Sequence, residues 1–533
     1  MMMENRINNI RDDFTKELRN IPLPEFPDNS FNIKDFSAVS GGEEKTTAAI
    51  NSAINECSQQ GGGTVIIPRG IWLTGPIYLQ DNVNLHLEEG ALVLFSRDFA
   101  DYPLIQTTYE GQKQVRCTSP INGENLTNIA ITGQGVIDGS GHIWRPVKRY
   151  KVTDKMWNKL VASGGVVDDD DRIWWPSENA LHGPEIVKEL QEKNAPIEEY
   201  EKVREYLRPV LLSLIKCKNV LLDGPVFQNS PAWNIHPLLC ENLIIQNITV
   251  RNEAYAQNGD GIDLDSCKNV YLHDAMFDVG DDAICLKSGK NEQGRKRGVP
   301  CEDMLIENCK VYAGHGGFVI GSEMSGGVKN IKVQNCTFMG TDCGLRFKTT
   351  RGRGGIVENI FINDINMIDI KTEPIRFNMF YAGRSDGSEE VLFDKKPVTE
   401  ETPVFKQIYI NNVSCRGAKK AVKLEGLPEM FIDKIYIEDV QLLAQKGIEC
   451  VNAHNLEFIN TDVKVEDEVV IEIMQGQNIK FENMNIDQDN QIIIKGRDTD
   501  KIKFVRCDFP EDYDGFVVAP DLEEKENLIL FSD

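Results

Sequence analysis

Between residues 258 and 348 the sequence holds side chains suited to acid–base chemistry and to anion binding. They are Asp260, the adjacent Asp281 and Asp282, His315 between two glycines, and the pair Arg346 and Lys348. Carboxylates at close range raise one another's pKa, so one can hold a proton as a general acid while a neighbour stays ionised as a base. Two cations two positions apart on a strand face the same side and suit a carboxylate ligand. This set predicts acid–base catalysis on a substrate that carries a carboxylate.

The spacing of the carboxylates also carries information. Asp260 and Asp281 lie 21 residues apart, which is close to one coil of a solenoid and predicts a separation of roughly 5–10 Å. Inverting glycosidases need about 6.5–9.5 Å between acid and base. We expect Gly280 to permit a bend that turns both Asp281 and Asp282 toward solvent. The alternative is that aspartate beside glycine caps a turn, which is our interpretation of Asp278.

The elements that must position these residues form a repeat. Phrases of a polar residue, usually Asn, followed by aliphatic residues begin at Asn242, Asn269, Asp303, Asn330 and Asn359, at intervals of 27–34 residues. Recurring β-rich units of about this length are typical of a solenoid, in which each coil packs on its neighbours. The reactive residues fall in similar parts of successive coils, so stacking predicts that they form one column. We expect the recurrent Asn to form a side-chain ladder, which is a structural role.

Outside the column, the pattern predicts an arm over residues 1–30 and a single catalytic domain over residues 31–533. A helix over 46–59, with Ala48, Ile50, Ala53, Ile54 and Cys57 at helical spacing, would cap the open end of the solenoid. The 46 residues from Asn82 to Asn128 would make two coils of about 23 residues.

Residues 142–207 interrupt the repeat and are predicted to form a large, partly helical insertion. Four of the six Trp lie in it, at positions 144, 157, 174 and 175. Trp can anchor an insertion to its scaffold or form a platform for sugars, and we favour anchoring. A loop beside one coil is expected at 381–396.

Composition and cysteine usage narrow the class of protein. A net charge of −25 argues against nucleic acid and against anionic membrane surfaces. The thirteen Cys are scattered without a CxxC pair, so we expect buried free thiols and no zinc or redox motif. The sequence shows no metal-ligand spacing and no Gly-rich phosphate loop before a helix, so we expect neither a metal nor a cofactor. Free thiols and an N-terminus without a signal-peptide pattern favour a cytoplasmic enzyme. A periplasmic or secreted location applies if a leader was removed.

Four ordered motifs resemble those of glycoside hydrolase family 28, the polygalacturonases. They are Asn258-Gly259-Asp260, Gly280-Asp281-Asp282, Gly314-His315-Gly316 and Arg346-Phe347-Lys348. The resemblance implies that Asp281 is the general acid, that Asp260 and Asp282 activate water, and that His315 tunes the acid. It implies that the residues binding the galacturonate are Asn258, Lys287, Arg346 and Lys348. Gly259 departs from the family, in which Thr is common.

The resemblance further implies a right-handed parallel β-helix that hydrolyses α-1,4-galacturonosidic bonds of polygalacturonate or oligogalacturonides with inversion. The long insertion resembles the bacterial exo-acting branch more than the compact fungal endo enzymes. Separately, the insertion and the 381–396 loop are expected to wall one end of the groove, which predicts action from a chain end. A rhamnogalacturonan-type hydrolase, a pectate lyase and a non-catalytic carbohydrate-binding β-helix are the alternatives. Arg346 and Lys348 argue against the rhamnogalacturonan reading, and a lyase would need calcium ligands and a basic proton abstractor.

Overall fold

The computed structural model describes residues 15–381 and 389–532, and it divides into two compact units. The first ends at Cys285 and the second begins at Leu286, so the boundary falls within strand β24 (Asp282–Lys287). Each unit is a stack of coils built from parallel strands, which confirms the predicted parallel β-helix. The arm over residues 1–30 and the single domain over residues 31–533 stay predictions. Residues 1–14 of that arm lie outside the described residues.

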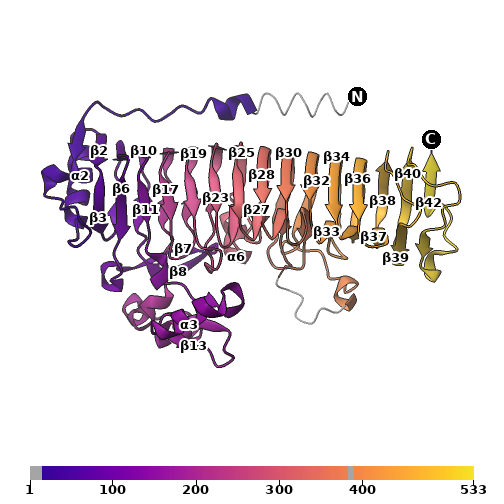
Figure 1. The fold of residues 1–533 in the computed structure, drawn as a ribbon, viewed down its shortest axis with the longest axis horizontal. Coiled ribbons are helices and arrows are strands. Elements are labelled where there is room, and N and C mark those ends of the chain that lie inside the picture. The colour runs from indigo at the N-terminus through magenta and orange to yellow at the C-terminus, as the bar shows by residue number, and fades with distance from the viewer. Residues whose placement is uncertain (1–14, 382–388, 533) are drawn as a thin grey trace. The chain divides into compact units, whose positions relative to one another are not determined.

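From β2 onward, each coil of the first unit contributes strands to three parallel ladders. Figure 1 shows the coils following one another in chain order. The first ladder contains β1 (Ser30–Asn32), β2 (Gly63–Ile67), β5 (Val83–Leu87), β10 (Thr127–Gly133), β16 (Lys218–Asp223), β19 (Glu241–Gln246) and β22 (Lys268–His273). The second contains β3 (Gly70–Thr74), β6 (Ala91–Phe95), β11 (Val136–Asp138), β17 (Val226–Gln228), β20 (Thr249–Arg251) and β23 (Met276–Asp278). The third contains β4 (Ile77–Tyr78), β9 (Ile121–Glu124), β15 (Leu212–Ile215), β18 (Ile235–Leu238) and β21 (Ile262–Asp265). Alternate residues of β2, β5 and β6 are buried in the core, as expected for a period of two, whereas every residue of β18 and β21 is buried.

The second unit has longer strands, several of which turn a corner of the coil. One series is β25 (Cys301–Glu307), β26 (Lys310–Ala313), β28 (Val328–Met339), β30 (Ile356–Ile368), β32 (Val404–Arg416), β34 (Ile432–Ala444), β36 (Ala453–Val465), β38 (Gln477–Glu482), β40 (Asp500–Val505) and β42 (Ile529–Ser532). The other is β27 (Gly316–Gly321), β29 (Cys343–Lys348), β31 (Ile375–Asn378), β33 (Lys420–Glu425), β35 (Lys446–Val451), β37 (Val469–Met474), β39 (Gln491–Lys495) and β41 (Phe516–Val518). Core aromatics stack between coils: the Phe347 and Phe377 ring centroids lie 4.1 Å apart, with the rings 3° from parallel.

The anchor residues form the predicted ladder. The side-chain amide of Asn242 donates to Asn219 at 3.0 Å, and that of Asn269 donates to Asn242 at 3.1 Å. All three residues have φ values of 55–58°. Asn adopts this left-handed conformation more readily than other residues with a side chain. The recurrent Asn therefore turns the corner of each coil and also bonds to the next one.

The predicted number of coils before Asn128 is wrong. The Asn128 amide donates directly to Asn82 at 3.2 Å, and β10 pairs with β5, so the intervening 46 residues make one coil. Its extra length is an antiparallel hairpin of β7 (Leu104–Tyr109) and β8 (Gln112–Cys117). Counting failed because the hairpin and its connections are about as long as a coil. The 91 residues from Asn128 to Asn219 are likewise one coil with an insertion, since β10 also pairs with β16.

Helix α2 (Thr47–Gln59) caps the first coils, as predicted, and it packs on β1, β2, β4 and β5. Its buried face consists of Ala49, Ile50, Ala53, Ile54 and Cys57. Ala48, which we assigned to this face, is exposed, and Ala49 takes its place. Both alanines fit a helical period, and the packing of the neighbouring strands decides between them.

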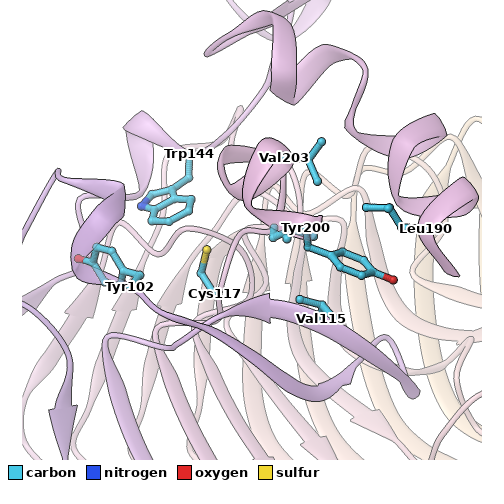
Figure 2. Packing of buried hydrophobic residues seen from close by; sticks show 8 residues of the cluster. Tyr102, Val115, Cys117, Trp144, Leu190, Tyr200 and Val203 are labelled. Carbon is cyan, nitrogen blue, oxygen red and sulfur yellow. The ribbon is translucent and has the colours of Figure 1, made fainter. Parts of the chain in front are cut away.

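The predicted insertion is present and projects from the coils of the first unit (Figure 1). It contains η3 (Gly141–Ile143), β12 (Val147–Lys148), η4 (Arg149–Lys151), α3 (Asp154–Ala162), β13 (Val166–Val167), β14 (Ile173–Trp175), α4 (Glu178–Leu181), α5 (Gly183–Glu192) and η5 (Ile197–Tyr206). Trp144 is buried in a cluster shared by the insertion and the β7–β8 hairpin (Figure 2). Trp157 and Trp174 are buried in a second cluster, which includes Tyr255 from a coil. The predicted anchoring role of these three Trp is confirmed.

In the second unit the structure describes the helix α6 (Asn291–Arg297) and the short helix η6 (Glu389–Leu392). The predicted loop at 381–396 is described at Tyr381 and from residue 389 onward, and residues 382–388 lie outside the described residues. All thirteen Cys are free, and twelve of them are buried. Burial raises the pKa of Cys57 to about 11, as expected for an unreactive core thiol. Among the described residues, no helix is both long and apolar enough to cross a membrane.

Candidate active site

The three predicted catalytic carboxylates lie together in the first unit. Asp260 precedes β21, Asp281 precedes β24, and Asp282 begins β24. One oxygen from each lies within 4.8 Å of the others, which is slightly closer than we predicted from strand spacing alone. Three carboxylates so close together cannot all be ionised without an electrostatic cost. We call them the acidic triad.

The members of the triad differ in exposure. Asp281 is half-buried, while Asp260 and Asp282 are only 3% and 1% exposed. The expectation that Asp281 and Asp282 both face solvent is therefore wrong for Asp282. Its side chain lies in the buried β24, where every residue is packed, and only Asp281 precedes the strand.

Backbone contacts between consecutive coils fix the triad. The Gly261 amide donates to the Asp282 carbonyl at 2.9 Å, and the Asp282 amide donates to the Asp281 carboxylate at 3.0 Å. A Cβ atom on Gly280 would lie 2.5 Å from the Glu253 carbonyl oxygen, so any larger residue would push these loops apart. Gly280 is thus required for close packing of the loops, a reason that differs from the bend we expected.

Asn258, a predicted substrate-binding residue, is held by a residue that the sequence did not reveal. Arg208 donates from Nη2 to Asn258 Oδ1 at 2.9 Å and from Nη1 to the Gln257 carbonyl at 2.9 Å. Arg208 lies two residues after η5, at the point where the chain leaves the insertion. The exit of the insertion therefore contacts the chain two residues before Asp260.

In the second unit, Lys287 forms a buried ion pair that was also not predicted. Its Nζ lies 3.2 Å from Glu323 Oε2, and the two side chains are 4% and 12% exposed. Burial by itself would raise the pKa of Glu323, but Lys287, Lys348 and Lys290 outweigh it and hold that pKa at about 2. Glu323 is consequently ionised and faces a group of lysines.

Arg346 and Lys348 share one side of β29, as their spacing predicted. The Arg346 guanidinium and the Lys348 ammonium lie 5.7 Å and 4.9 Å from the centre of the Tyr381 ring. Phe347 between them points into the core. Because successive side chains of a strand point to opposite faces, the two cations lie on one side of β29 and Phe347 on the other. The Tyr381 ring orients both cations.

His315 is half-buried and directly precedes β27. Its Nε2 lies 3.8 Å from Asp342 Oδ2, and Asp342 in turn pairs with Lys371 at 2.9 Å. A carboxylate beside one ring nitrogen restrains the orientation of the imidazole. That all predicted site residues form one column stays a prediction, because the structure brings them together within each unit separately.

Three residues with clear contacts to the predicted set were missed, namely Arg208, Glu323 and Tyr381. Glu323 lies in a Gly-Ser-Glu-Met stretch and Tyr381 begins an irregular loop, and neither position repeats from coil to coil. Their only signal was proximity to a turn, which is weak.

The oxygens of the acidic triad are also close enough to surround a cation, although acidic groups gather in this way in sites that bind none.

Comparison with known proteins decides the family. The family model for glycosyl hydrolases family 28 matches residues 148–454 of the chain. The chain belongs to this family. It is 32% identical to a hyperthermoactive exopolygalacturonase from Thermotoga maritima, with a TM-score of 0.69, covering 88% of this chain and 96% of that one. It is therefore a glycosidase with the parallel β-helix of family 28.

Curated relatives extend the similarity. The chain is 28% identical over 430 residues to a probable polygalacturonase from Vitis vinifera, covering 79% of this chain and 75% of that protein. It is 25% identical over 404 residues to an endo-polygalacturonase from Pectobacterium carotovorum, covering 73% of this chain and 84% of that protein. The relatives of this family 28 chain thus include proteins named as exo-acting and as endo-acting.

Proposed function

We propose that this family 28 enzyme hydrolyses α-1,4-galacturonosidic bonds of galacturonan or oligogalacturonides with inversion, and that it acts from a chain end. The observation that carries the proposal is the acidic triad, whose oxygens lie within 4.8 Å of one another. Buried carboxylates of like charge are destabilising unless they are used. Family membership and the names of the relatives support the choice of substrate.

The differing exposure of the triad supports a division of roles. Asp281 is the most exposed of the three, so it is the best placed to donate a proton to the glycosidic oxygen. Asp260 and Asp282 are buried beside it and accept a proton from the attacking water. Inversion is supported by the family resemblance and not by this spacing, because the triad oxygens lie closer together than the separation of about 6.5–9.5 Å that is typical of inverting glycosidases. His315, restrained by Asp342, is the auxiliary group that tunes the acid.

The cations of the second unit supply recognition. Arg346 and Lys348 bind the galacturonate carboxylate, Arg as a planar fork and Lys as a point charge. Lys287 pairs with the ionised Glu323 at 3.2 Å, which holds its ammonium in place. A surface of net charge −25 repels a polyanion, so such local cations are necessary for binding.

The exo mode is supported by where the insertion touches the coils. Lys151 donates to the Gly280 carbonyl at 3.3 Å, just before Asp281, and Arg208 donates to Gln257 and Asn258, just before Asp260. Two buried clusters containing Trp anchor the insertion. A rigid body beside the triad obstructs the path of a long chain on that side.

Two measurements on polygalacturonate test this function. Proton NMR of the first product should show the inverted anomer before mutarotation. Chromatography should show mono- or digalacturonate from the first minutes, while the viscosity of the polymer barely falls. A retained anomer would contradict the assigned mechanism. An early ladder of intermediate oligomers with a rapid fall in viscosity would contradict only the exo mode.

A further inference from the structure

Two buried arginines of the first unit lie near the triad without an acidic partner. Arg116, from β8, is 7% exposed, and Arg208, from the end of the insertion, is 9% exposed. In residues 15–381 and 389–532, no carboxylate lies within ion-pair distance of either guanidinium. A buried charge without a counter-ion is strongly destabilising. The arrangement therefore calls for an anion.

The two arginines are rigidly supported. The Arg116 guanidinium lies 3.9 Å from the centre of the Tyr109 ring, and it donates from Nη2 to the Arg208 carbonyl. The Tyr109 ring packs on Trp233, with a centroid distance of 4.6 Å. The Tyr109 hydroxyl is buried and has no hydrogen-bond partner among the described residues. The hairpin and the insertion, which are absent from a plain coil, thus build this cationic pair together.

Counting donors shows that Arg208 retains capacity for a ligand. A guanidinium has five N–H donors. Arg208 uses three at most, for Pro231, Gln257 and Asn258. Its Nε–H and one N–H of Nη2 remain. Because Arg208 also holds Asn258 Oδ1, the amide nitrogen of Asn258 points away from it and is the end that can donate to a ligand.

The charge of the substrate supplies the anion. Each sugar of a galacturonide carries one carboxylate, so a site that spans more than one sugar needs more than one cationic contact. Arg346 and Lys348 are proposed for one carboxylate. Arg208 places the pair that it forms with Arg116 beside the triad, because it holds Asn258 two residues before Asp260. Glu110 and Asp260 are the acids whose charge acts on the neighbouring Tyr109 phenol.

We propose that Arg208, backed by Arg116, is a second carboxylate-recognition residue, which binds the uronate of a sugar next to the cleaved bond and orients Asn258 toward it. This inference rests on the proposed function and deepens it. It assigns to the insertion a specificity role in addition to obstruction.

The test compares charged and neutral ligands in Arg208→Gln and Arg208→Lys. With trigalacturonate, we expect KM for Arg208→Gln to rise roughly tenfold to a hundredfold, with a smaller change in kcat. With the methyl-esterified trimer, KM should change little, because the ester carries no charge. Arg208→Lys should recover part of the affinity, since it keeps the charge and loses the planar group.

Arg204→Gln is the matched control. Arg204 also lies in the insertion and donates to backbone carbonyls, those of Phe99 and Tyr102. We expect a lower Tm and no discrimination between the acid and the ester. If Arg208→Gln weakens both ligands equally, or only lowers Tm, Arg208 is structural and the inference is overturned. If Arg208→Gln does not fold, the decision rests on Arg208→Lys. The quantity compared is again its change in KM for trigalacturonate relative to its change in KM for the methyl-esterified trimer.

Calorimetric titration of trigalacturonate into Asp281→Asn separates this inference from the proposed function. If the double variant Asp281→Asn, Arg208→Gln binds trigalacturonate more weakly than Asp281→Asn alone, the result supports uronate recognition by Arg208. Binding that stays unchanged overturns the inference and leaves the proposed function standing. Absence of any hydrolysis of galacturonides by the wild-type enzyme would instead contradict the proposed function itself.

Discussion

The coils that carry the insertion differ from the plain coils over residues 404–505 in the burial and pairing of their charged side chains. In the plain coils, most charged side chains are partly exposed, and several pair with opposite charges on the next coil. Lys480 lies 2.6 Å from Glu457, and Lys495 lies 3.0 Å from Glu472. Glu425 is an exception, since it is 3% exposed and pairs with Lys423 of its own strand. Near the insertion, side chains of like charge lie close together. They are the three carboxylates of the triad, of which Asp260 and Asp282 are buried, and the two buried guanidiniums of Arg116 and Arg208.

This difference indicates which charges the fold needs. Each coil is held by its core and by its ladders, so a half-exposed ion pair adds little. Buried groups of like charge lower stability. Their presence in only some coils shows that stacking does not require them. The comparison therefore predicts large functional effects in the irregular coils and small ones in the plain coils.

The largest effect is expected for Asp281→Asn. Removing the proposed acid should lower kcat by at least about 10²–10⁴-fold. Tm should hardly change, because Asp281 is half-buried and its exchange relieves repulsion within the triad. Initial rates on polygalacturonate with parallel thermal melts measure both. Asp278→Asn, three residues earlier, is the control and should keep its activity. Retention of more than a tenth of wild-type activity by Asp281→Asn would remove Asp281 from the mechanism.

The same comparison separates what could be predicted from what could not. The coils were predictable because Asn at left-handed corners and alternating core residues recur with every turn. The hairpin at 104–117 was not, since its length imitates a coil. The triad was predictable because its residues follow the period. Arg208 reaches Asn258 across 50 positions of sequence, and only the folded insertion brings the two together.

A smaller effect, on stability, is expected for Glu323→Gln. The variant leaves Lys287 buried beside other lysines without a counter-ion, which should cost about 3 kcal/mol of unfolding free energy at pH 7. The pKa of Glu323 is depressed from 4.5 to about 2 in the folded enzyme. Its stabilisation is therefore complete above pH 4.5 and is lost as the pH falls toward 2.

Urea unfolding at several pH values checks this sign. The difference between wild type and Glu323→Gln should be large at pH 7 and should shrink steadily below pH 4.5. A difference that stays constant from pH 7 to pH 3 would show that Glu323 stabilises by packing alone.

The next effect concerns recognition. Lys348→Ala removes a 6% exposed ammonium, and we expect binding of galacturonate to weaken by about 1.5–3 kcal/mol, the usual contribution of a hydrogen bond to a charged group. Binding of a neutral galactose analogue should hardly change. Titration calorimetry with both sugars measures the loss of affinity for each. An equal loss on both would identify Lys348 as a partner of Glu323 only, and the cationic group of the second unit would then be structural.

The smallest effect is expected in the plain coils, for Lys480→Ala. Lys480 contacts Glu457 at 2.6 Å and Glu482 at 2.9 Å, yet it is 28% exposed. Solvent screens such a pair, and holding two long side chains in place costs entropy, so the variant should lose only about 0.2–1 kcal/mol. The kcat and KM on polygalacturonate should equal those of wild type. Urea unfolding at low and high salt measures how much of this difference in unfolding free energy is electrostatic, and that part should decrease as the salt concentration rises. A loss above about 2 kcal/mol would mean that inter-coil pairs hold the solenoid together, and the contrast between the two kinds of coil would then fail.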